Sequence, residues 1–175
     1  MNFKRFQVIF PIFRGMAFAA LVCLLFSGCV KYSFKGALPS YLKTISIPLF
    51  EDRSRRVGLQ ENISQGVINA FVQDNTLRVV ENEEDADLVL KGTILEVQIR
   101  RTSISPEEVV ELQQLVVSVK VECLNLHTNK ALWSGTVSDF GEVSGDANQA
   151  EEDQAIEAAV EKVIAEILNR TIAAW

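Results

Sequence analysis

The sequence predicts an α+β domain, a two-layer sandwich in which two helices pack on one face of a four- to five-stranded, mostly antiparallel sheet. Several short segments alternate apolar and polar side chains, which is the period of strands with one buried face. Two longer segments repeat apolar side chains every three or four residues, as amphipathic helices do. In chain order the segments read β-α-β-β-β-β-α, so two helices are available to cover the apolar face of one sheet.

The first strand is predicted over residues 44–50, TISIPLF, where Ile45, Ile47 and Leu49 alternate toward the core. Pro48 has no N–H to donate to a neighbouring strand, which predicts a sheet edge or the end of the strand. The charged stretch EDRSRR follows as a loop.

Both helices are predicted from their apolar stripes. The first begins near Leu59 and ends near Asp74-Asn75, and its apolar positions are Leu59, Ile63, Val67, Ile68, Phe71 and Val72. The second runs from about Gln149 to Thr171. It has acidic residues in its first turn and Arg170 near its end, which complements the helix dipole. Its apolar positions are Ile156, Val160, Val163, Ile164, Ile167 and Leu168.

The remaining strands are predicted over residues 76–81, 88–99, 115–123 and 131–140. The second of these changes phase, because Leu88 and Leu90 share one parity whereas Leu95, Val97 and Ile99 share the other. A strand changes its buried face only through an extra residue, so we expect a β-bulge near Gly92. The third alternates cleanly, and HTNK at residues 127–130 predicts the hairpin turn that follows it.

The N-terminal region has the features of a secretory signal. Residues 1–15 contain Lys4, Arg5 and Arg14 and no acidic residue, and residues 16–26 are continuously apolar but too short to cross a bilayer comfortably. The following Ser27-Gly28-Cys29 resembles the bacterial lipobox, which implies acyl chains on Cys29; the alternative is an ordinary signal peptide with a chance cysteine. We therefore expect a removed signal at 1–28, a lipidated tether at 29–42 and a single domain at 43–175. Val30 follows the cysteine in place of the aspartate associated with inner-membrane retention, so the resemblance implies the outer membrane.

Composition restricts the function of the mature chain. Removing residues 1–28 from the 175-residue chain leaves 147 residues with 14 basic and 23 acidic side chains, a net charge of −9. This charge argues against nucleic acid as a partner. Besides Cys29 only Cys123 remains, so an intramolecular disulfide is excluded. Cys123 has the inward parity of its strand and is predicted to be a buried small hydrophobe.

Catalytic and metal-binding patterns are not found in the sequence. His127 is the one histidine and falls in a predicted hairpin turn, where a solvated side chain is expected. With one histidine and one remaining free cysteine, zinc-ligand spacings cannot be assembled. The acidic runs NEEDAD and EED are typical of solvated faces. We therefore expect no enzyme, no metal and no cofactor apart from the acyl chains on Cys29.

Basic residues cluster in loops despite the acidic total. Arginine guanidinium groups suit phosphate, so loops that converge at one end of the sheet would make a phosphate site. The alternative is that these arginines pair with neighbouring acids such as Glu51, Asp52 or Glu96. The candidate phosphate contacts are Arg53, Arg55, Arg56, Arg100, Arg101 and Lys130.

Four spaced motifs together carry a resemblance to a known family. GCVKYSFKG, TISIPLFEDRS, ADLVLKGTI and ALWSG are similar to segments of the LPS-assembly lipoprotein (LptE) family. The positions that match are Cys29, Tyr32, Ser33, Phe34, Gly36, Ile47, Pro48, Phe50, Ala86, Asp87, Leu88, Leu90 and Gly92.

The resemblance implies a non-enzymatic outer-membrane lipoprotein, held by its lipid anchor on the periplasmic side or inside a partner barrel. Such proteins plug the lumen of a β-barrel translocon, the LPS-assembly protein, help it to fold, and assist insertion of lipopolysaccharide into the outer leaflet. The resemblance also implies lipopolysaccharide binding through basic loop residues, here Arg100, Arg101 and Lys130. The alternative is an outer-membrane lipoprotein that activates a peptidoglycan synthase or assembles a secretion pore, although these usually have longer linkers. An anchored hydrolase has no supporting residues.

Overall fold

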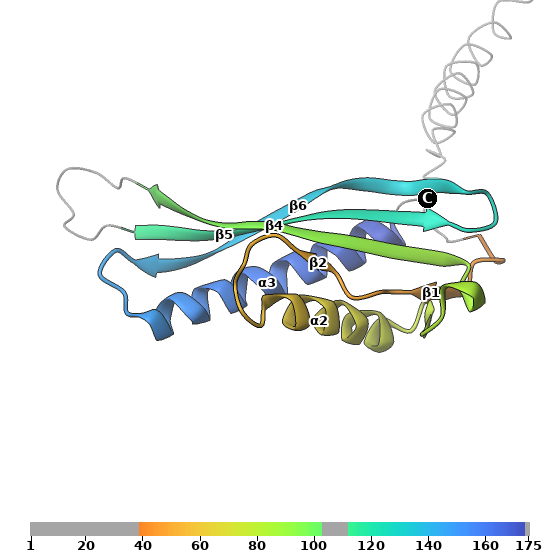
Figure 1. Ribbon diagram of the computed structural model, residues 1–175, viewed down its shortest axis with the longest axis horizontal. Coiled ribbons are helices and arrows are strands. Elements are labelled where there is room, and N and C mark those ends of the chain that lie inside the picture. The colour runs from red at the N-terminus through yellow and green to blue at the C-terminus, as the bar shows by residue number, and fades with distance from the viewer. Residues whose placement is uncertain (1–38, 103–111, 174–175) are drawn as a thin grey trace, which may run out of the picture. The chain divides into compact units, whose positions relative to one another are not determined.

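Two helices pack against one face of a single sheet, which confirms the α+β sandwich (Figure 1). The computed structural model describes residues 39–102 and 112–173, all within one compact unit, Gly36–Trp175. Cys29, the lipobox and the motif residues 32–36 lie outside the described residues. The elements in chain order are β1 (Thr44–Ser46), β2 (Glu51–Asp52), α2 (Leu59–Asp74), β3 (Arg78–Val80), the 3-10 helix η1 (Glu83–Asp85), β4 (Leu88–Thr102), β5 (Leu112–Asn125), β6 (Lys130–Ser144) and α3 (Gln149–Ile172).

The sheet is mixed rather than mostly antiparallel. Its order is β3-β1-β4-β5-β6, and β2 pairs with β4 off this path. β1 runs parallel to both β3 and β4, and β2 runs parallel to β4. The physical reason is that α2 carries the chain from β2 back to β3, and a helical crossover of this kind joins parallel strands. The long strands β4, β5 and β6 form antiparallel hairpins, as the sequence predicts.

The first predicted strand is interrupted, and the prediction that Leu49 points inward is wrong. β1 ends at Ser46, Pro48 lies just beyond it, and only residues 51–52 return to the sheet as β2. Leu49 is 62 % exposed, whereas Phe50 is fully buried. Because the chain leaves the ladder after Ser46, strict alternation no longer applies, and the larger Phe50 side chain enters the core instead.

The change of phase predicted for the strand over residues 88–99 is confirmed, but the prediction that the bulge lies near Gly92 is wrong. Gly92 pairs with Val121 in regular register, and the register shift lies between Ile94 and Glu96. A Cβ on Gly92 would overlap the ring of Phe50, so this glycine is needed for a close approach rather than for a bulge. The extra residue is therefore Leu95.

The core lies between the helices and the inward face of β4 and β5. Val67 and Phe71 of α2 and Val163 and Ile167 of α3 are fully buried, as their helical spacing predicts. The predicted alternation of β5 is confirmed by the burial of Leu115, Val117, Val119, Val121 and Cys123, although Val116 on the other side of the strand is buried too. Burial raises the pKa of the Cys123 thiol to about 12, so this side chain stays protonated and unreactive at neutral pH.

Candidate functional site

The outward side of β4, β5 and β6 forms a long polar surface, which we call the open sheet face. Its centre carries short polar side chains, and Ser118 Oγ lies 2.9 Å from Ser138 Oγ across two strands. Cations and carboxylates alternate on it in near-equal number, so it is close to neutral. From the pairing register its polar side chains are Lys91, Thr93, Glu96, Gln98, Arg100, Gln114, Ser118, Lys120, Glu122, Ser134, Thr136, Ser138 and Glu142, and the apolar Val89, Val116, Leu124 and Phe140 lie on the same side.

The opposite side of the molecule is acidic. The exposed residues of α3 include Asp153, Glu157 and Glu161, which face away from the sheet because the other side of the helix is buried. The acidic excess of the chain is thus carried in large part by the helical layer. The open sheet face differs from it in charge and in having no helix over it among residues 39–102 and 112–173.

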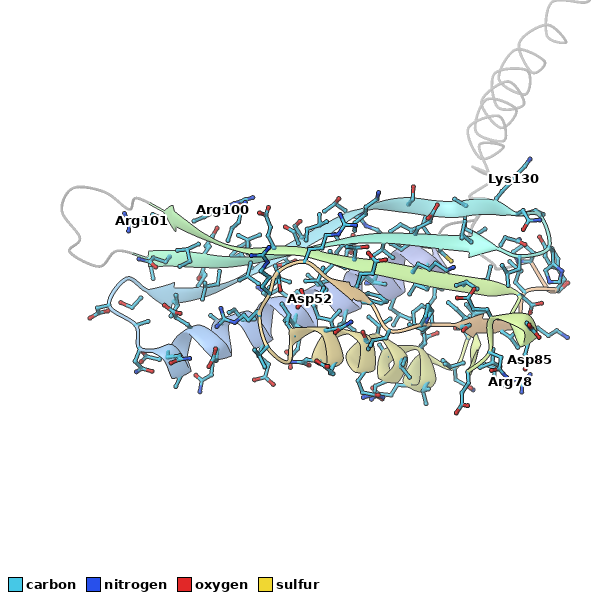
Figure 2. The ribbon with its side chains drawn as sticks, in the orientation of Figure 1. Asp52, Arg78, Asp85, Arg100, Arg101 and Lys130 are labelled. Carbon is cyan, nitrogen blue, oxygen red and sulfur yellow. The ribbon has the colours of Figure 1, made fainter. Side chains whose placement is uncertain are left out.

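The structure separates the predicted basic residues instead of gathering them. Arg100 and Arg101 lie near the end of β4, and Lys130 begins β6 at the opposite end of the sheet (Figure 2). Lys130 pairs with Asn125, which pairs with Leu88, about a dozen residues before Arg100 along β4. At roughly 3.3 Å per residue this places them about 40 Å apart. One phosphate group cannot contact both ends.

Arg100 and Arg101 also lie on opposite faces of the sheet, because the side chains of consecutive strand residues alternate between the two faces. Arg100 lies on the open sheet face in register with Gln114. Arg101 shares the other side of β4 with Ile99, which is 56 % exposed. Within the described residues neither arginine has an acidic side chain within 4.0 Å, in contrast to the predicted pairing with Glu96.

Two of the three arginines after β2 pair with nearby acids. Arg53 Nη2 lies 3.5 Å from Glu51 Oε2, as the alternative interpretation predicts. Arg56 Nη2 donates to Asp153 Oδ1 at 2.7 Å and thereby ties the loop to the N-terminal part of α3. Arg55 and Arg56 line a shallow open depression together with Glu152 and Asp153. This depression therefore carries both positive and negative side chains.

Asp87 is a structural centre that the sequence patterns did not single out beyond the family resemblance. Its Oδ2 accepts from the backbone N–H of Lys43 at 2.8 Å and from the N–H and hydroxyl of Thr44, both at 3.0 Å. Its Oδ1 lies 2.6 Å from Nε2 of His127. The carboxylate therefore joins the start of β1 to the turn between β5 and β6. An aspartate immediately before a buried strand was the available signal.

The environment of Asp87 favours its charged form. Partial burial by itself raises the pKa of this carboxyl. Hydrogen bonds from Lys43 N–H, His127 and Thr44 together lower the pKa by more than burial raises it, so that the pKa falls from 3.8 to about 2. His127 is half exposed, as predicted for a turn residue, yet it is fixed by Asp87 and by an edge-to-face contact with Tyr41 at 5.7 Å between ring centroids. Among the described residues, the Thr44 hydroxyl lies beside this pair and is engaged with Asp87 and with Asp85 O.

Metal-ligand clusters and membrane-spanning helices are both absent from residues 39–102 and 112–173. No three potential metal-binding side chains come together there. Neither α2 nor α3 combines the length and the apolar character that crossing a bilayer by a helix requires.

Known proteins of similar fold come from several bacteria. The hypothetical protein CT253 from Chlamydia trachomatis aligns with a TM-score of 0.58 at 11% identity, over 76% of this chain and 98% of that chain. A PelC dodecamer subunit from Paraburkholderia phytofirmans gives 0.55 at 14% identity, over 79% and 94%. Uncharacterised lipoprotein B from Nitrosomonas europaea gives 0.54 at 18% identity, over 78% and 85%. At these identities the likeness establishes the fold alone.

Sequence comparison is more specific than the fold. Among curated protein sequences, none matches this chain significantly. The family described as lipopolysaccharide-assembly, LptE, matches over residues 42–172, which includes Pro48, Phe50, Asp87 and Gly92 of the resemblance but not its opening motif at Cys29. Because this match spans most of the chain and both helices, the protein belongs to the lipopolysaccharide-assembly (LptE) family.

Proposed function

We propose that this chain is the lipid-anchored plug subunit of an outer-membrane lipopolysaccharide translocon. In this proposal Cys29 carries the acyl chains, and the domain assists assembly of a β-barrel partner, the LPS-assembly protein, and insertion of lipopolysaccharide into the outer leaflet. A two-chain anchor holds a protein stably on a membrane, whereas a single chain does so only marginally. The observation that carries the proposal is the family match combined with the open sheet face.

The open sheet face has the chemistry that a water-filled barrel lumen requires. Barrel interiors are polar, so a plug must present hydrogen-bonding groups without a large excess of one charge. The hydroxyls of Ser118 and Ser138 and the opposed charges of Lys120 and Glu122 meet this requirement. Partners that meet through such a surface are held by many polar contacts and by shape complementarity rather than by an exposed hydrophobic patch. The acidic outer side of α3 lacks this balance.

A bulky side chain at the centre of the open sheet face tests the docking surface. We expect Ser118→Trp to reduce copurification of the barrel from detergent-solubilised membranes by about tenfold or more, because the indole prevents close approach of a flat polar surface. Gln65→Trp on the exposed side of α2 is the matched control and should leave copurification unchanged. Equal recovery of the barrel with both variants would contradict docking through this face. Recovery of a peptidoglycan synthase instead would support the alternative function.

Lipopolysaccharide contact is proposed for the tip of β4. Arg101 and the exposed Ile99 share one side of this tip, and Arg100 lies on the other. A cation beside an exposed apolar side chain suits an amphiphile with a phosphorylated headgroup. Contacts by Arg53, Arg55, Arg56 and Lys130 stay predictions for separate positions, since the structure does not bring these residues to the tip.

Removing both tip arginines separates lipopolysaccharide binding from barrel assembly. We expect the double variant Arg100→Ala, Arg101→Ala to weaken binding of purified lipopolysaccharide by about tenfold or more, since each charge-assisted contact is worth about 1.5–3 kcal/mol. Barrel copurification should persist. The control is Lys43→Ala with Arg78→Ala, which removes the same charge from exposed side chains elsewhere. An equal loss in this control would mean that only net charge matters.

A further inference from the structure

The outer edge of β6 presents unpaired backbone groups among the described residues. β6 is the last strand of the sheet, and its inner side is fully occupied by β5. The carbonyl of Ile94 accepts from Arg53 N–H on the β2 side of β4. Ile94 is in register with Val119 but directs its backbone groups away from β5, so the N–H and C=O of Val119 point toward β6. There Val119 pairs with Val137, whose own N–H and C=O therefore point back toward β5. The N–H and C=O groups of the even-numbered residues Ser134, Thr136 and Ser138 therefore point outward.

Both ends of this free stretch are closed. Beyond Ser138, the Phe140 carbonyl accepts from Lys162 Nζ at 2.7 Å, and the Phe140 N–H donates to Asp139 Oδ1 at 2.8 Å. Before Ser134, the register with β5 shifts around Leu132. A charged side chain such as that of Lys162 and a β-bulge are two common ways in which an edge strand is protected from pairing with another chain. Leu132 and Phe140 lie at equal distances from Thr136, so the unprotected segment is centred on that residue.

The segment Ser134–Ser138 is complementary to itself when two copies run antiparallel. With Thr136 on a two-fold axis, Ser134 of one copy faces Ser138 of the other, and Gly135 faces Val137. The outward N–H and C=O groups of all three even-numbered residues then find partners. The resulting hydroxyl pairs match the contact that Ser118 and Ser138 already make within the chain. The glycine leaves room for the facing valine.

The charges of α3 beside this edge have the same complementarity. Arg170 lies over Gly135, since a Cβ there would be 3.9 Å from its Nη1, and Lys162 reaches the Asp139 carboxylate at 3.7 Å. Glu166 lies between them on the helix and accepts from Arg170 at 2.7 Å. Because the axis brings Gly135 opposite Val137, Arg170 of one copy comes opposite Glu166 of the other. This arrangement attracts and does not repel a second copy.

We propose that the free subunit self-associates through β6, forming a two-fold antiparallel pairing of Ser134–Ser138 centred on Thr136. The inference goes beyond the proposed plug function and does not require it. A second copy is the occupant because the wall of a closed barrel has all of its strands paired and offers no edge. The paired segment is short, so the dimer belongs to the small, weak class of interfaces.

Charge placed on the axis tests the pairing. The full-length chain in detergent is expected to show concentration-dependent dimers in sedimentation, with a Kd on the order of 10–100 μM. Thr136→Glu puts two carboxylates face to face across the axis and should weaken dimerisation by about tenfold or more. Thr93→Glu is the matched control, because Thr93 and Thr136 flank Lys120 on its two sides but Thr93 lies in a central strand. It should leave the dimer unchanged.

Cross-linking supplies a second measurement that does not depend on affinity. A hydrogen-bonded antiparallel pair has its Cα atoms about 5.5 Å apart, within disulfide range. Thr136→Cys should therefore give a covalent dimer under mild oxidation, whereas Thr93→Cys should not. A chain that stays monomeric throughout this concentration range, or dimers that persist in Thr136→Glu, would overturn the inference while leaving the barrel-copurification result unaffected.

Discussion

Gly141→Ala is expected to destabilise the domain by about 3 kcal/mol or more and to lower its Tm by about 10 °C. Gly141 is buried on β6, and a Cβ there would overlap the backbone carbonyl oxygen of Ala155 in α3. The obstacle is main chain, so no rotamer change relieves it and the helix must move away from the sheet. Ala159, Val163 and Ile167 of α3 are fully buried and would lose contacts together. Thermal and urea unfolding followed by circular dichroism measure this loss.

Gly135→Ala is the matched control for this prediction. Gly135 lies on the same strand and the same side as Gly141, but an added Cβ there would meet only the end of the Arg170 side chain at 3.9 Å. Strand propensity and the lower entropy of the unfolded chain then make the change neutral or slightly stabilising. A similar loss of stability in both variants would show that glycine flexibility in β6, and not close packing on α3, sets the cost.

Local patterns were sufficient for the elements whose environment is uniform along their length. β5 is covered by helices on one side from Leu115 to Cys123, so simple alternation predicts the residues buried on that side, but not Val116, which is buried on the other. The stripe from Leu59 to Phe71 predicts α2 in the same way. Alternation failed at Leu49 and Phe50, because pairing stops at Ser46 and the choice of buried side chain there depends on Gly92, which is distant in the sequence. The close approach of the Phe50 ring to Gly92 also explains why a glycine stands at this position although the bulge lies elsewhere.

The candidate site was less accessible to sequence analysis, since its geometry depends on register. Arginines and a lysine in loops suggest convergence, yet the pairing of β4 with β5 and β6 places Arg100 and Lys130 at opposite ends. The polar side of β5 was predicted, but the neutrality of the whole open sheet face needed three strands in known register. Asp87 had only a family resemblance to distinguish it among many carboxylates, because its partners Thr44 and His127 are about forty residues away on either side.

Asp87→Asn is expected to remove about 2 kcal/mol of stability at neutral pH, and the difference from the natural chain should vanish in acid. In the folded chain the Asp87 pKa is about 2, below its ordinary value of 3.8, and the side chain is only 19 % exposed. A carboxyl whose pKa is depressed by folding contributes fully above about pH 4 and loses that contribution as the pH falls toward about 2. Asparagine keeps the shape of the side chain but cannot supply the charge that the N–H groups of Lys43 and Thr44 face.

Urea unfolding of both chains at about pH 7, 4 and 2.5 measures this difference directly, because the other carboxylates titrate alike in the two and cancel. Asp85, whose side chain accepts from Asn82 just before η1, supplies the neighbouring control: Asp85→Asn should change stability little at any of these pH values. If the gap between the natural chain and Asp87→Asn stays constant down to about pH 2.5, the charge of Asp87 does not stabilise the junction, and only its shape does. A gap that narrows toward about pH 2.5 would show that the charge of a single carboxylate holds the first strand to the β5–β6 turn.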